Sequence, residues 1–89
     1  MWPQSVTVKN MPFHLQGWNG EYVCDGKMKE DAPVYRLNPY TYLLFFDIIG
    51  VQIEKTRDCD SEPVFFRNSE KLFGSLYNCH NDKMAEIVP

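Results

Sequence analysis

The sequence of 89 residues lacks helical periodicity, long apolar runs and an excess of positive charge. A helix that spans a membrane needs about 18 or more consecutive apolar residues, and no stretch of this chain approaches that length. Nine basic and twelve acidic residues give a net charge of −3, which disfavours binding to phosphate backbones and to anionic membranes. We therefore expect no membrane partner, and a nucleic-acid-binding small β-barrel is only the alternative to the main hypothesis below.

The motifs of enzymes are also missing from the sequence. It contains no G-x-S-x-G, no H-E-x-x-H and no glycine loop that could cradle a phosphate. Cys79 and His80 are adjacent, so on a strand they would point apart and could not form a nucleophile–base pair. We expect no enzyme, no catalytic residue and no cofactor.

Metal sites are disfavoured by the spacing of their usual ligands. The cysteines at positions 24, 59 and 79 do not form the closely spaced pairs of structural zinc sites. Asp58, Asp60 and Glu62 have the spacing that opens a calcium loop. However, Pro63 stands where that loop needs a flexible Gly, and Ser69 stands where it needs a bidentate Glu. We predict a solvated acidic loop and no bound metal.

The number of cysteines bears on the cellular compartment. Three cysteines cannot all pair within one chain, so a reducing setting is the simplest interpretation. The first residues lack the basic region and the apolar core of a signal peptide. One disulfide and one free thiol in a secreted protein is the alternative. We predict an intracellular, cytoplasmic location.

Short apolar alternations bounded by turn residues recur about every ten residues, which is typical of a small all-β protein. The content of 44% hydrophobic and 15% aromatic residues fits a packed domain. We predict an all-β fold, a small antiparallel sandwich or partly open barrel of about six to eight short strands, in which residues 1–89 form a single β domain. The predicted strands are Ser5–Lys9, Glu21–Cys24, Val34–Leu37, Tyr42–Phe46, Val51–Lys55, Val64–Phe66 and Met84–Val88, with residues 72–79 ambiguous between a strand and a helical turn.

The segment Tyr42–Phe46 is apolar at every position and is the most informative part of the chain. Side chains alternate along a strand, so Leu43 and Phe45 share one face and the other three residues share the opposite face. A chain of this length has little material left to cover a second face, unless the sheet closes into a barrel with the N-terminal segment folded over it. The candidate partner-binding residues of the outer face are Tyr40, Tyr42, Leu44 and Phe46.

These observations favour a non-catalytic protein–protein interaction or assembly domain of an intracellular protein. The partner would be another protein or a second copy of the chain in a homodimer. An exposed strand edge could contribute by pairing with an extended segment of the partner.

Two segments carry a resemblance to a known module. Asn19–Tyr22 reads Asn-Gly-Glu-Tyr, and Pro33–Arg36 reads Pro-Val-Tyr-Arg. Together with the apolar strand that follows, this order resembles a short β-rich module with an Asn-Gly-x-Tyr … Pro-x-Tyr-Lys/Arg pattern, found singly or in arrays in large protist proteins. The similarity covers roughly Val6–Ile53, and Val51 stands where the module often has Trp. The resemblance implies a compact antiparallel β domain used as an accessory or interaction unit, with no known activity.

Overall fold

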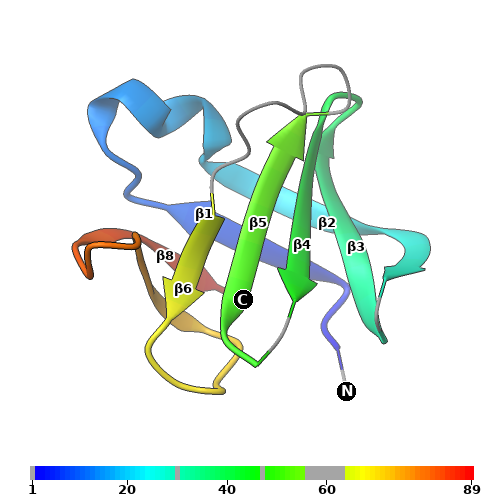
Figure 1. Ribbon diagram of the computed structural model, residues 1–89. Coiled ribbons are helices and arrows are strands. Elements are labelled where there is room, and N and C mark those ends of the chain that lie inside the picture. Colours follow the sequence, from blue (N-terminus) through cyan, green and yellow to red (C-terminus); the bar gives the residue numbers. More distant parts are fainter. Residues whose placement is uncertain (1, 30, 47, 56–63) are drawn as a thin grey trace.

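The computed structural model describes residues 2–29, 31–46, 48–55 and 64–89, and at residues 46, 54, 55 and 64 it describes the backbone alone (Figure 1). Its eight strands are all antiparallel, each pairs with the next, and the last pairs with the first to close a barrel. The all-β class and the small antiparallel barrel are therefore confirmed. The strands are β1 Ser5–Lys9, β2 Gly20–Lys29, β3 Ala32–Asn38, β4 Thr41–Phe46, β5 Gly50–Lys55, β6 Val64–Arg67, β7 Gly74–Tyr77 and β8 Lys83–Val88.

Two elements differ from the sequence-based expectation. A 3₁₀ helix, η1 (Phe13–Trp18), connects β1 to β2 and was not predicted. The strand β2 continues to Lys29, beyond the predicted strand Glu21–Cys24. Gly26 has a φ of 86°, and the pairing of β2 with β3 shifts in this region, so a bulge lets the strand continue. No helix in the described part of the chain has the length and the hydropathy needed to cross a bilayer.

The pairing of neighbouring strands is uneven around the barrel. β4 and β5 pair over six residues each, from Thr41 opposite Lys55 to Phe46 opposite Gly50. β6 and β7 pair at two positions, Phe66 with Tyr77 and Arg67 with Leu76. The seam between β6 and β7 therefore has the least backbone pairing among the described strands.

The interior of the barrel is filled by one cluster of apolar side chains. Leu43 and Phe45 of β4 point into this cluster, where they meet Val51 and Ile53 of β5. Tyr22 and Tyr35 also lie inside it, and their rings are fully buried. Alternation then places Tyr42 and Leu44 on the outer face of β4, as expected.

Candidate functional site

The predicted partner-binding residues lie in different environments. Tyr40 is exposed in the turn between β3 and β4, whereas Leu44 is buried, with 5% of its surface exposed. The neighbouring strand β3 pairs Tyr35 with Leu43, and Val34, the residue before Tyr35, is buried as well. The expectation of an open apolar face is therefore wrong at Leu44. The side chain of Phe46 lies outside the described part of the structure.

Tyr42 is half-buried because an arginine of the neighbouring strand lies over it. The Arg36 Cζ atom is 4.7 Å from the centroid of the Tyr42 ring, and Nη2 of Arg36 donates a hydrogen bond of 2.7 Å to the Tyr42 hydroxyl. Asp25 of β2 forms an ion pair of 3.3 Å with the same guanidinium. A polar layer thus covers the outer face of β3 and β4 near Tyr42.

Exposed apolar side chains gather instead at the end of the barrel where the chain enters β1. Ile48 and Ile49 form the turn between β4 and β5, and Ile48 is 65% exposed. Trp2 precedes β1 and is 40% exposed. Figure 1 shows the N-terminus and the turn between β4 and β5 on the same side of the barrel. We call Trp2, Ile48 and Ile49 the end patch.

Residues Trp2–Gln4, here called the strap, lie across this end of the barrel. The Tyr35 hydroxyl donates a hydrogen bond of 2.7 Å to the carbonyl of Pro3. The backbone N–H of Cys24 donates one of 2.9 Å to the carbonyl of Gln4. The Trp2 ring packs on Phe45, with 5.4 Å between the ring centroids. Burial raises the pKa of Tyr35, and its electrostatic interaction with Cys24 raises it further, which favours the protonated hydroxyl that donates to Pro3.

Arg67 lies against Phe45 at the same end of the barrel. Its guanidinium donates to the carbonyl oxygens of Ile48 at 2.7 Å, Lys71 at 3.2 Å and Ile49 at 3.5 Å. Its Cζ atom is also 5.3 Å from the centroid of the Phe45 ring. Only 7% of its surface is exposed, and this burial lowers the pKa of Arg67, although a guanidinium stays charged in proteins. Arg67 therefore fixes the turn that presents Ile48 and Ile49.

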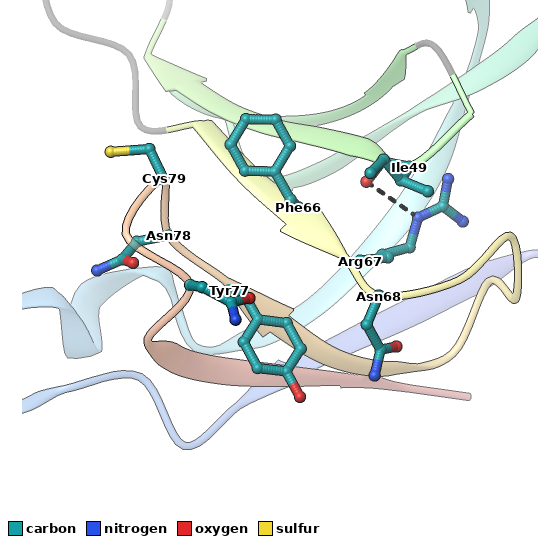
Figure 2. A pocket seen from close by; sticks show the side chains of 8 residues that line it. Ile49, Phe66, Arg67, Asn68, Tyr77, Asn78 and Cys79 are labelled. Atoms are coloured by element: carbon teal, nitrogen blue, oxygen red, sulfur yellow. Dashed lines mark hydrogen bonds between the residues drawn. The ribbon is translucent and has the colours of Figure 1, made fainter.

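A groove of about 320 Å³ lies beside the end patch, over the seam between β6 and β7. Figure 2 shows the Arg67 side chain extending toward Ile49, away from Tyr77 and Asn78. The lining offers aromatic rings, amides and a thiol, and it contains no carboxylate. The groove joins the end patch through Ile49, and its other lining residues are Phe66, Arg67, Asn68, Tyr77, Asn78, Cys79 and Asn81.

The described residues bring no three potential metal ligands together. Cys24 and Cys79 are free thiols, and Cys79 is exposed. The predicted acidic loop, with Asp58, Asp60, Glu62 and Cys59, lies outside the described residues. The expectation that the protein is not an enzyme stays a prediction.

The end patch was not predicted from the sequence, although one signal pointed to it. Ile48 and Ile49 lie between the predicted strands Tyr42–Phe46 and Val51–Lys55, and a short connection between strands places two large apolar side chains where water is expected. The position of Trp2 over Phe45 offers no comparable local signal, because the two residues are far apart in the sequence.

Comparisons with known proteins do not place the chain in a family. No family model matches it, and no curated protein and no solved structure matches it. The resemblance to the β-rich module of large protist proteins therefore stays a prediction.

Proposed function

We propose that this chain is a non-catalytic protein-interaction domain that docks a partner on the end patch. The observation that carries the proposal is the grouping of Trp2, Ile48 and Ile49 at one end of the barrel. Exposed apolar groups that gather in one place mark interaction surfaces, whereas scattered ones are normal on any protein. Phe13 on η1 and Met28 on β2 are exposed apolar residues of other elements.

The size of the end patch favours a short segment of a partner over a second folded copy. A stable interface between two proteins buries about 800 Å² on each side, and three side chains supply only a fraction of that area. Arg67 adds rigidity, because it holds the backbone of both isoleucines in place before the partner arrives.

The proposal is tested by matched charge substitutions in the full chain. Ile48→Lys places a charge in the end patch, while Met28→Lys places the same charge at a similarly exposed apolar residue of β2. Partners captured from an extract of the source organism by the native chain are expected to fall at least tenfold with Ile48→Lys and to persist with Met28→Lys. Equal losses with both variants, or a loss confined to Phe13→Lys, would overturn the assignment of the end patch.

Two further measurements separate this function from its alternatives. Light scattering across protein concentrations should show a monomer, because the end patch is too small for a stable dimer. Titration with single-stranded RNA at low salt should show no binding. The net charge of −3 disfavours a positive groove, and Arg36 and Lys83 form ion pairs with Asp25 and Glu86. Salt-sensitive binding of RNA would favour the nucleic-acid alternative.

A further inference from the structure

The strap shows which chemistry the end of the barrel accepts. An aromatic ring, Trp2, occupies the surface of Phe45. The next residue is Pro3, whose carbonyl oxygen accepts a hydrogen bond from the Tyr35 hydroxyl. The carbonyl oxygen of Gln4 accepts one from the backbone N–H of Cys24. Together these contacts select an extended segment with an aromatic residue followed by two accepting carbonyl oxygens, and a proline after the aromatic residue favours that extended conformation.

The attachment of the strap differs from that of η1, which covers the other end of β1. η1 is continuous with β1 on one side and with β2 on the other, so it cannot leave without disturbing two strands. The strap lies outside the strands, and the contacts that hold it include the packing of Trp2 on Phe45 and two hydrogen bonds. Trp2 also keeps 40% of its surface in water, so its release costs less than that of a fully buried ring.

We infer that the end of the barrel is a receptor for an aromatic–proline segment, which the strap fills within the chain and which a partner segment can fill in its place. The inference rests on the proposed function, because it names the partner chemistry for the same end of the barrel. The partner's aromatic ring would lie on Phe45, and its proline carbonyl would accept from Tyr35. Ile48 and Ile49 would contact the residues that flank this pair.

Competition by the strap sets the expected affinities. A segment tethered next to its own site acts at an effective concentration of about millimolar or more. A partner segment meets the site only in the fraction of molecules whose strap is released, so its apparent affinity is reduced by that fraction. Removing the Trp2 ring should therefore strengthen the binding of a free aromatic–proline peptide at least tenfold relative to the native chain.

The test uses the full chain with Trp2→Ala and two synthetic peptides. The probe is acetyl-Trp-Pro-Gln-Ser-amide, and the control is acetyl-Ala-Pro-Gln-Ser-amide. Binding is followed by NMR chemical shifts of isotope-labelled protein, which report position as well as affinity. We expect saturable shifts around Phe45 and Tyr35 of the Trp2→Ala chain with the Trp peptide. Binding should be at least tenfold weaker for the Ala peptide, and at least tenfold weaker for the native chain.

Two results would overturn the inference. One is a folded Trp2→Ala chain that shows no saturation with millimolar Trp peptide. The other is equal binding of the Trp and Ala peptides. If Trp2→Ala does not fold, the Trp peptide must restore folding in a concentration-dependent manner, because a ligand of the native state raises its stability. Failure of that rescue would equally overturn the inference.

The outcomes also separate this inference from the proposed function. If the peptide does not bind but Ile48→Lys still abolishes capture of partners, the end patch docks a partner of different chemistry and only the inference fails. If the peptide binds but Ile48→Lys changes nothing, the receptor stands and the proposed role of the isoleucines fails. A self-association of the native chain that Trp2→Ala abolishes would identify a second copy as the occupant and overturn the assignment to a separate partner.

Discussion

The two ends of β1 are closed by similar contacts that are anchored differently. At the η1 end, the Tyr22 hydroxyl donates to the carbonyl of Trp18 at 2.7 Å, and the Trp18 ring lies edge-on to Phe65 with 6.4 Å between centroids. At the strap end, Tyr35 donates to a strap carbonyl at the same distance, and the strap contributes the tryptophan. Each end thus combines one buried tyrosine, one covering tryptophan and one core phenylalanine.

The comparison shows how one type of contact can hold a fixed element, η1, at one end of β1 and an exchangeable segment, the strap, at the other. η1 closes on itself through backbone hydrogen bonds and returns directly into β2. The strap has no such internal bonds among the described residues, and the guanidinium of Arg67 supports its end of the barrel independently of it. The strap end can therefore keep its shape when the strap leaves, which a receptor requires.

The largest expected effect comes from removing the charged support of the strap end. Arg67→Met keeps an apolar chain of similar length but leaves the carbonyl oxygens of Ile48, Ile49 and Lys71 without their donor. We expect a loss of about 3 kcal/mol in the free energy of unfolding, since hydrogen bonds to charged groups are the strong ones. Urea denaturation measures it. Lys71→Met, at an exposed position, is the control, and a loss no larger than that of the control would contradict the role of Arg67.

The next largest effect is the loss in the free energy of unfolding when either tryptophan is replaced by alanine. Trp18→Ala should cost about 2–3 kcal/mol and Trp2→Ala about 1–2 kcal/mol, because Trp18 is more buried than Trp2. The midpoints of urea denaturation of the two variants give the comparison directly. A larger cost for Trp2→Ala would mean that the strap is a fixed structural element and not an exchangeable one.

Much of the strand framework could be predicted from local patterns. The bounds of β1 were predicted as observed, and the alternation in Tyr42–Phe46 correctly separated the two faces of β4. Turn residues such as Asn38 mark the breaks between strands, because they adopt tight turns at low cost. These features are local, so a single sequence contains the information.

The remaining features depend on contacts between distant residues. Leu44 is buried although it lies on the outer face of β4, and Tyr42 is covered by Arg36 of β3, so neither result follows from the pattern of β4 alone. Closure of the barrel by β1 and β8 joins the two ends of the sequence, and the strap lies on Phe45 for the same reason. Short-range periodicity predicted the strands but not the end patch.

High pH offers a way to probe the buried tyrosines of both ends. Burial raises the pKa values of Tyr22 and Tyr35, so both keep their protons in the folded state when the unfolded chain ionises at about pH 10. The folded state then binds more protons, and stability falls as the pH rises above that value, by at most about 1.4 kcal/mol per pH unit for each tyrosine until its folded-state pKa is reached. Urea denaturation from pH 8 to 11 measures the slope. Tyr22→Phe and Tyr35→Phe should each reduce it, and an unchanged slope in either variant would show that the residue is not protected.

The smallest expected effect concerns an acid-sensitive hydrogen bond at the η1 end, between Asn10 and Glu86. The Asn10 amide donates a hydrogen bond of 3.0 Å to the Glu86 carboxylate, which also meets Lys83 at 3.8 Å. The Asn10 hydrogen bond, followed by the charge of Lys83, lowers the pKa of Glu86 in the folded state. The stabilisation is therefore present above the pKa that Glu86 has in the unfolded chain, and it is lost as the pH falls through the lower pKa of the folded state. Asn10→Gly removes the amide and tolerates the φ of 65° found at this position.

An NMR titration of the Glu86 carboxyl group measures its pKa and so tests this hydrogen bond. Asn10→Gly should raise the pKa of Glu86 toward its ordinary value, and Asn68→Gly, at an exposed amide of the β6–β7 connection, should leave it unchanged. A pKa that responds only to Lys83→Met would show that charge, not the amide, holds Glu86. Arg67 keeps its proton throughout the acid range, so amide exchange should quicken beside Asn10 before it quickens beside Ile48. Acid would then loosen the η1 end first. The strap end would remain closed by the hydrogen bonds of Arg67, whose guanidinium keeps its charge.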